Sequence, residues 1–229
     1  GQSFFRRTRW IAAAVVLVLA AFSFWWYNQQ NQLLEYATDF GQVRQILLPD
    51  GSAVSLNANS SISFSPDLNT QNVREVWLKG EAFFSVKHTA RHTKFRVHSK
   101  GVEIDVLGTE FNVSDRHQST KVVLQSGKVQ ISAANRSATL QPGDMIEFSS
   151  GTQQLTRRRV KTELYSTWKE KVWLLEGETM HEVAQRIEDN FGVKVVFENQ
   201  DLPNEKISGT ISTGSLEEVS EILSDLLKA

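Results

Sequence analysis

Two groups of side chains in this 229-residue chain have types and spacings that could support chemistry. His88 and His92 lie four residues apart, the spacing at which two imidazoles on one helix face can hold a metal ion. The surrounding segment KHTARHTK is basic and loop-like, so it does not predict the helix that such a site requires. The remaining histidines share no spacing with this pair: His98, His117 and His181. We therefore expect no metal site.

Acidic side chains offer a second possibility, a carboxylate pair for hydrolysis, which would make the protein an anchored enzyme. The candidates Glu81, Asp105 and Glu110 each lie in a strand or turn pattern, with no glycine-flanked nucleophile nearby. The sequence contains no GxSxG, HExxH or phosphate-cradling glycine loop, and no cysteine for a thiol nucleophile or a zinc site. We expect no catalytic residue, no cofactor and no enzymatic activity.

Two further sets of residues suit either a structural or a binding role. Asn57, Asn59 and Ser60 fit turns whose short polar side chains bond neighbouring backbone groups, and glycan recognition is the alternative. Phe83 points away from the strand face that Phe84 occupies, so it either packs elsewhere or binds a partner. Their residue types therefore leave both roles open.

The composition is that of a globular protein that does not bind nucleic acid. Hydrophobic residues make up 40% and charged residues 22%, which is enough to bury a core. The net charge of −1 comes without a basic stripe, whereas binding to phosphates needs clustered lysines and arginines. The one basic triplet, Arg157 to Arg159, fits a solvated linker. These features exclude nucleic acid as a partner.

The chain contains two consecutive regions with different sequence patterns. Apolar and polar residues alternate from Gly41 to about Ser149, with turns at Asp50-Gly51, Gly80 and Gly108, and this predicts an all-β sandwich or solenoid. From Trp168 a strand and a helix follow one another twice, which predicts a small α+β domain with a βαβ repeat. We therefore expect two folded parts.

The α+β part contains an internal repeat. Thr179 and Ser215 each precede a predicted helix with a glutamate three residues on, so both helices are expected to begin with a capping box. The first is expected to end at Gly192, followed by a strand over 193–197. The second reaches the last residue, Ala229, with no strand after it, so we expect this domain to be truncated.

An uncharged apolar run occupies residues 10–27, WIAAAVVLVLAAFSFWWY, and three arginines precede it. Eighteen helical residues span about 27 Å, close to the roughly 30 Å hydrocarbon core of a bilayer. Arg6, Arg7 and Arg9 place the N-terminal side in the cytoplasm by the positive-inside rule. A transmembrane helix is thus expected, with membrane-spanning residues Trp10, Leu17, Trp25, Trp26 and Tyr27.

Two alternatives to this helix are a cleaved signal peptide and a buried core helix. The bulky FSFWWY end has no small-residue cleavage site, and the flanks are too asymmetric for a core helix. The chain begins with Gly1 instead of Met, so we expect a preceding cytoplasmic segment. The expected organisation is a cytoplasmic end (1–9), a transmembrane helix (10–27), a tether (28–40), an all-β domain (41–150), a linker (151–167) and an α+β domain (168–229).

Four segments carry a family resemblance. LPDGSAVSLNANSSISF (48–64), WLKGEAFFSV (77–86), VLGTEFNV (106–113) and LQSGKVQI (124–131) resemble the FecR family of membrane-anchored anti-sigma regulators in sequence, order and spacing. The C-terminal part is similar to that family's secretin/TonB short N-terminal module, although Lys171 stands where many relatives have glycine. We expect structural roles for the motif residues Asp50, Gly51, Gly80, Glu81, Phe84, Gly108, Thr109, Phe111 and Asn112.

The resemblance implies a function in signal transduction. In this family a cytoplasmic segment holds an extracytoplasmic-function (ECF) sigma factor, and the periplasmic part senses the signalling domain of a TonB-dependent outer-membrane transporter. Proteolysis of the anchor by site proteases then releases the sigma factor, so the implied location is the bacterial inner membrane. A sheet edge suits strand addition by the transporter domain, with candidate partner-binding residues Lys206, Ile207, Ser208, Gly209, Thr210 and Ile211. The alternative is a membrane-anchored periplasmic glycan- or envelope-binding module.

Overall fold

The computed structural model of the chain describes residues 17–23 and 32–227. Residues 17–23 are helical, and the side chain of Leu17 is exposed. None of the helices formed by the described residues is both long and apolar enough to cross a membrane. Trp10, Trp25, Trp26 and Tyr27 lie outside the described residues, so the membrane-spanning helix stays a prediction.

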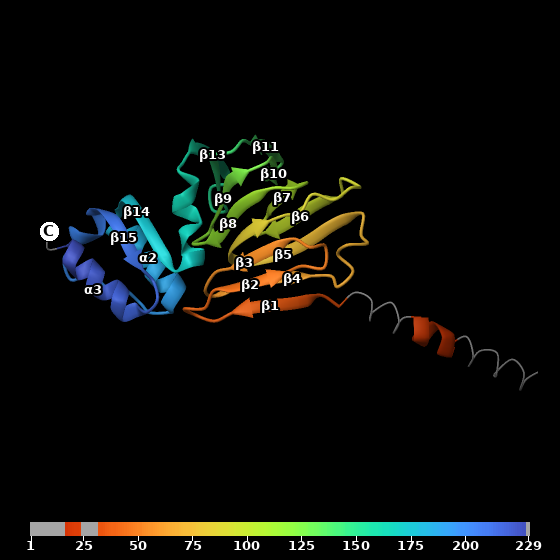
Figure 1. Cartoon of the computed structure of the whole chain (residues 1–229), viewed down its shortest axis with the longest axis horizontal. Coiled ribbons are helices and arrows are strands. Elements are labelled where there is room, and N and C mark those ends of the chain that lie inside the picture. Colours follow the sequence, from red (N-terminus) through yellow and green to blue (C-terminus); the bar gives the residue numbers. More distant parts are fainter. Residues whose placement is uncertain (1–16, 24–31, 228–229) are drawn as a thin grey trace, which may run out of the picture. The chain divides into compact units, whose positions relative to one another are not determined.

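Thirteen strands make up the larger part of Glu35–Ala229 (Figure 1). In chain order they are β1 (Leu34–Thr38), β2 (Arg44–Leu47), β3 (Ala53–Leu56), β4 (Ser60–Phe64), β5 (Val73–Ser85), β6 (Lys94–Ser99), β7 (Val102–Val106), β8 (Glu110–Arg116), β9 (Ser119–Ser126), β10 (Val129–Ala133), β11 (Arg136–Leu140), β12 (Asp144–Ser149) and β13 (Gln154–Arg159). The expected all-β domain is confirmed, and we call β1–β13 the β domain.

The long strand β5 joins the two halves of this domain. Its first half pairs with β4 and, in parallel, with β6, which leads through β7 and β10 to β11. Its second half pairs with β3 and with β8, which leads through β9 and β12 to β13. Gly80 lies where the halves meet, with φ +87°, and an added Cβ would clash with Ser60 Oγ. The turn predicted at Gly80 is thus wrong, because the glycine bends a continuous strand.

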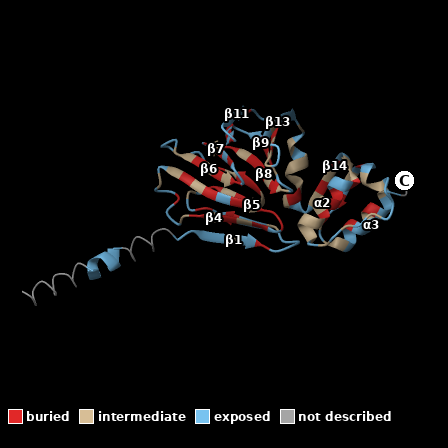
Figure 2. Ribbon diagram, turned by 180° about the vertical axis from the view of Figure 1, so that it is seen from behind, coloured by how far each residue is buried: buried red, intermediate tan, exposed pale blue. Residues whose placement is uncertain are grey.

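The core of the β domain is built from the apolar positions of the alternating segments, as Figure 2 shows in red. Phe84 stacks on Phe111 with ring centroids 5.1 Å apart, and both side chains are fully buried. Val102, Ile104 and Val106 point inward from β7, as the alternation predicts. The hydrophobic effect of this shared core holds the two halves together.

Two segments expected to be irregular contain strands. β1 lies inside the stretch 28–40, expected to be a tether, and pairs with β4. β13 lies inside the stretch 151–167, expected to be a linker, and pairs with β12 along its whole length. Arg157 and Arg159 of β13 form ion pairs with the buried carboxylate of Asp144. The basic triplet is therefore part of the sheet and not a solvated linker.

The remaining elements form the smaller part of Glu35–Ala229, which we call the C-terminal unit. They are the 3-10 helices η1 (Thr162–Tyr165) and η2 (Thr167–Glu170), strand β14 (Val172–Thr179), helix α2 (Met180–Phe191), 3-10 helix η3 (Leu202–Asn204), strand β15 (Lys206–Ser212) and helix α3 (Leu216–Leu226). β14 and β15 pair antiparallel, so the unit repeats strand and helix without a parallel βαβ connection. Its core includes Trp168, Trp173, Ile187 and Ile211.

The helix boundaries of the C-terminal unit largely follow the sequence signals. Thr179 and Glu182 form the complete capping box of α2, and Gly192 ends this helix in the left-handed conformation. Ser215 caps α3 by accepting from Glu218 N, but the Glu218 carboxylate binds the hydroxyl of Ser212 instead of reaching back. The second capping box is thus only half formed.

The strand predicted over 193–197 is wrong. Val193, Val195 and Phe197 alternate and pack against the core of the unit, but no strand pairs with them in the described chain. The backbone N–H of Val195 donates instead to the carboxylate of Glu188 on α2. Alternating burial without a hydrogen-bonded neighbour therefore gives an extended segment and no sheet.

Candidate functional site at the junction of the two parts

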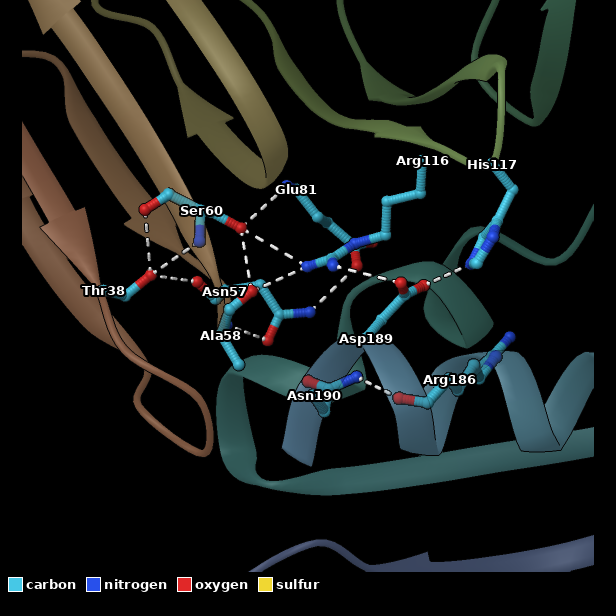
Figure 3. A network of polar contacts seen from close by, with 10 residues as sticks. All are labelled: Thr38, Asn57, Ala58, Ser60, Glu81, Arg116, His117, Arg186, Asp189 and Asn190. Atoms are coloured by element: carbon cyan, nitrogen blue, oxygen red, sulfur yellow. Dashed lines mark hydrogen bonds and ion pairs between the residues drawn. The ribbon is translucent and has the colours of Figure 1, made fainter. Parts of the chain in front are cut away.

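Three motif residues from different parts of the sequence meet at the edge of the β domain. Asn57 follows β3, Glu81 lies on β5 and Asn112 lies on β8, which pairs with β5. The Glu81 carboxylate accepts a 2.8 Å hydrogen bond from Asn57 Nδ2 (Figure 3). It accepts a second bond of 2.8 Å from Asn112 Nδ2. Glu81 thus links two segments of the β domain and is not one of a pair of free carboxylates.

A second set of bonds fixes the loop between β3 and β4. Ser60 Oγ donates to Ala58 O over 2.9 Å and accepts from Glu81 N over 2.9 Å. Arg116 Nη2 donates to Ala58 O over 2.7 Å, and Thr38 Oγ1 lies 2.5 Å from Asn57 O. The interpretation of Asn57 and Ser60 as residues that bond neighbouring turn groups agrees with these contacts. Thr38 ties the last residue of β1 into the same network.

Helix α2 of the C-terminal unit contacts this network through its C-terminal end (Figure 3). Asp189 lies 3.6 Å from Arg116 Nη1 and 2.9 Å from His117 Nε2. The carbonyl of Asn190 accepts a 2.6 Å hydrogen bond from the backbone N–H of Gly41. A helix C-terminus presents unpaired carbonyls of this kind, so α2 is suited to bind an N–H of another segment.

Apolar contacts accompany these polar ones. Phe40 packs so closely on Gly192 that an added Cβ would lie 2.8 Å from the ring. Val43 and Phe83 belong to the β domain but pack against the core of the C-terminal unit. The Phe83 side chain is 7% exposed, and Lys169 Nζ lies 3.6 Å above its ring. Phe83 thus has an internal partner, which settles the alternative left open above in favour of packing.

The other motif residues act inside the β domain. Gly51, with φ +81°, forms the turn before β3, and Asp50 accepts hydrogen bonds from the N–H and hydroxyl of Ser52. Gly108 passes so close to His88 that an added Cβ would lie 2.7 Å from that side chain. Thr109 Oγ1 donates to Lys128 O. These contacts agree with the structural roles expected for the motif.

Four residues that carry the ionic contacts were not selected from the sequence. Arg74 is almost completely buried and lies 2.7 Å from Asp50 Oδ2, with both side chains 1% exposed. Arg116, His117 and Asp189 meet across 72 residues of sequence. Pairs this distant in sequence carry no local signal.

The carboxylates considered and set aside as a hydrolytic pair are engaged in other contacts. Burial alone would raise the pKa of Asp105, but its hydrogen bonds with Arg96 and Lys94 lower the pKa below 3.8. Glu110 accepts from the hydroxyls of Ser85 and Ser126. Across 17–23 and 32–227, no three His, Cys, Asp or Glu side chains form a group that could hold a metal ion.

The predicted partner-binding residues form most of β15. Ile207 and Ile211 are buried in the core of the C-terminal unit, while Lys206, Ser208 and Thr210 are exposed. In the described part of the chain, β15 pairs only with β14. One edge of this small sheet is therefore open, as the prediction requires, and its use as a docking surface stays a prediction.

The fold is that of a two-part protein whose parts meet through the end of α2, and comparisons with known proteins identify its family. The family model described as "FecR protein" matches residues 35–130, and the model described as "FecR, C-terminal" matches residues 172–229. The chain belongs to the FecR family, which is regulatory and non-enzymatic. No curated protein matches the chain.

Two similar solved structures share this fold. Both are described as a "putative anti-sigma factor" from Parabacteroides distasonis, and both are 23% identical to this chain. One has a TM-score of 0.74 and covers 85% of this chain and 91% of its own. The other has a TM-score of 0.73 and covers 84% and 91%. At this identity the likeness establishes the common fold.

Proposed function

We propose that this protein is a membrane-anchored anti-sigma factor that relays a periplasmic signal to a cytoplasmic ECF sigma factor. It crosses the bacterial inner membrane once through residues 10–27, with its N-terminus in the cytoplasm. Its signal is the signalling domain of a TonB-dependent outer-membrane transporter. Family membership, the anti-sigma description of both similar structures and the apolar run behind three arginines support this proposal.

One observation carries the relay mechanism: the contact between the backbone N–H of Gly41 and the carbonyl of Asn190. Gly41 lies three residues after β1, the first strand that follows the predicted membrane helix. Asn190 lies at the end of α2, in the part expected to receive the signal. A partner that displaces the C-terminal unit therefore removes a contact from the membrane-proximal segment.

β1 is the element on which this displacement acts. Among the described residues it pairs with β4 alone, and its last residue, Thr38, is held through Asn57 and Ser60. Three of its five residues are exposed, so little apolar area secures it. We infer that loosening β1 exposes the preceding tether to site proteases, which release the sigma factor.

The open edge of β15 is the proposed docking surface for the transporter domain. Ile207 and Ile211 fix the strand to its core, while Ser208 and Thr210 remain exposed to a partner. An added strand would satisfy backbone groups that the two-stranded sheet leaves unpaired. Backbone pairing supplies affinity in such complexes, and exposed side chains supply specificity.

Capture by the full chain tests this proposal. The chain is reconstituted in nanodiscs and incubated with purified signalling domains of the same organism's TonB-dependent transporters, each at about 50 µM, well above the Kd of most specific complexes. Capture of one domain, lost in Thr210→Arg and kept in Thr139→Arg on the exposed edge strand β11, supports the proposal. Capture of none, or equal loss in both variants, contradicts it.

A further inference from the structure

A cavity of about 560 Å³ lies at the junction, and we call it the junction cavity. Its walls come from both parts of the molecule: Asn112, Arg116 and Glu147 from the β domain, and Glu178, Gln185 and Asp189 from the C-terminal unit. This volume falls within the range of small-molecule sites, which often form between domains. The junction cavity is therefore large enough for a ligand the size of one or two sugar rings.

Three buried polar atoms around the junction cavity have no hydrogen-bond partner among residues 17–23 and 32–227: Asn112 Oδ1, Arg116 Nε and Glu178 Oε2. The Asn112 side chain is the most deeply placed, since this residue is only 3% exposed. Its amide nitrogen donates to the Glu81 carboxylate, so Glu81 cannot be the partner of the amide oxygen. Buried polar groups are almost always paired, so three such atoms around one cavity indicate a missing polar partner.

The chemistry of these atoms specifies that partner. Two are acceptors and one is a donor, and a hydroxyl group can both donate and accept. Burial raises the pKa of Glu178, although Arg186 opposes this effect from 2.7 Å. A hydroxyl that donates to Glu178 Oε2 would stabilise its charged form. The atoms thus fit a ligand that carries several hydroxyl groups.

The charges around the junction cavity nearly cancel. Its acidic side chains are Glu81, Glu147, Glu176, Glu178, Glu182 and Asp189, and its basic side chains are Arg116, Lys121, Arg158, Lys161 and Arg186. Several of them already pair with one another, such as Arg116 with Asp189 and Arg186 with Glu178. A phosphate or a metal cation would gain little net electrostatic attraction here, whereas the binding of a neutral polar molecule does not depend on such attraction.

We propose that the junction cavity binds a neutral saccharide of one or two rings, with Asn112, Arg116 and Glu178 as its hydrogen-bond partners. This inference goes beyond the proposed function, because binding requires neither a transporter nor a sigma factor. Since both parts of the molecule line the cavity, a bound sugar would hold the C-terminal unit against the β domain. The saccharide is then a second input, which opposes opening of the junction.

The structure also supplies a competing site that serves as a control. A larger, more open groove of about 1230 Å³ contains Trp77 and His98, whose rings stack with centroids 5.2 Å apart. The Trp77 side chain is 39% exposed, and a sugar ring can stack on an exposed aromatic face. Sugar binding at this outer groove would depend on Trp77 and not on Asn112.

Isothermal titration calorimetry on the full chain in detergent micelles tests the assignment. The probes are glucose, galactose, N-acetylglucosamine and maltose, each titrated to about 20 mM, a concentration that detects Kd values in the millimolar range. We expect at least one to bind, with a Kd at least tenfold higher in Asn112→Leu. Because Asn112→Leu can disturb folding, Gln185→Trp blocks the junction cavity from the surface of α2. Trp77→Ala serves as the matched control and should bind as the wild type does.

Each outcome decides the question. Loss of binding in Gln185→Trp with retention in Trp77→Ala supports the junction cavity. The reverse pattern assigns the sugar to the outer groove and overturns the proposal. No heat of binding from any of the four sugars also overturns it, because water molecules alone then satisfy the three atoms. The transporter plays no part in this assay, so its result is independent of the capture experiment.

Discussion

The molecule contains two ionic contacts of opposite character. Arg74 and Asp50 lie 2.7 Å apart inside the β domain, and each side chain is 1% exposed. Asp189 meets Arg116 and His117 at the junction, where the three side chains are 20%, 11% and 41% exposed. Arg74 also donates to the carbonyls of Lys87 and Thr93, so its contact joins several segments. The first pair is sealed from water, whereas water reaches part of the second contact, chiefly at His117.

This difference suits the buried pair to a structural role and the junction contact to a regulatory one. Breaking a buried pair leaves one charge without water or a partner, so that contact survives as long as the β domain is folded. Asp189 and His117 are partly exposed, so water can hydrate them when the contact breaks, and the junction can open while both parts stay folded. A relay needs a contact that can open, such as the junction contact. It also needs a rigid part beside that contact, such as the β domain, which the buried pair stabilises.

The sharpest test of the buried pair is Arg74→Met. We expect a loss of about 3–5 kcal/mol in the free energy of unfolding, because Asp50 is left buried without its counter-charge. Chemical denaturation of the full chain in detergent measures this loss. Arg44→Met, at an exposed arginine that lies over Tyr36, should change the stability by less than about 0.5 kcal/mol. A loss below about 1 kcal/mol for Arg74→Met would contradict the role of the pair.

Gly192→Ala breaks the apolar side of the junction. Its backbone has φ +70°, and the new Cβ would meet the ring of Phe40 at 2.8 Å, so we expect a loss of about 2–3 kcal/mol. Gly101→Ala is the matched control, since φ is +78° but, apart from its chain neighbours, no atom of the described residues lies within 4 Å of the new Cβ. It should cost about 1 kcal/mol. Equal losses in thermal or chemical unfolding would show that the contact with Phe40 contributes nothing.

Asp144→Asn tests an acid between these extremes, because it is buried but its arginine partners are exposed. Burial alone would raise the pKa of Asp144, but bonds from Gln141 N–H, Arg157 and Arg159 lower it below 3.8 overall. Its stabilising effect is present above the unfolded pKa and is lost as the pH falls through the folded pKa. The stability difference between wild type and Asp144→Asn should therefore shrink below about pH 3.8, in denaturation curves at stepped pH. A difference independent of pH would contradict this cause.

Asp189→Asn breaks the ionic side of the junction. We expect a loss of at most about 1 kcal/mol, because Asp189 and His117 are partly exposed and water can take the place of the ion pair between them. The loss should decrease with added salt, since salt screens exposed charges. Stability measured at low and high ionic strength checks both statements. A loss as large as that of Arg74→Met would remove the distinction between the two contacts.

Lys171→Gly should act in the opposite direction. Lys171 ends η2 with φ 56° and ψ 42°, a left-handed conformation that favours glycine. Relief of this strain should raise the stability of the C-terminal unit by about 0.5 kcal/mol, after the entropy cost of the added glycine. Thermal unfolding measures this gain, and a destabilised variant would show that the lysine side chain makes a compensating contact.

Features that depend on local sequence could be predicted. Alternation in VEIDV gave the strand β7, and Thr179 with Glu182 gave the start of α2. These signals work because side-chain direction and capping depend on neighbours within four residues. The pattern over 193–197 failed for the same reason, since alternation does not show whether a pairing strand is available.

The junction could be predicted only in part. The resemblance singled out Glu81 and Asn112, but their meeting with Asn57 depends on the register of β5 against β8. Arg74 lies on a strand, where an arginine is normally exposed, and its partner Asp50 sits 24 residues away in a turn. Such contacts depend on how distant elements pack, and the order of residues alone does not show that.

Hydrogen exchange on the full chain tests the central claim, that α2 secures the membrane-proximal segment. Asp189→Arg places a positive charge against Arg116 and His117 and should separate α2 from the β domain. We predict faster exchange at the amides of Gly41, bonded to Asn190 O, and Asn59, bonded to Asp39 O, with unchanged exchange in β5 and β8. Unchanged protection of Gly41, or equal loss throughout the β domain, would contradict the account.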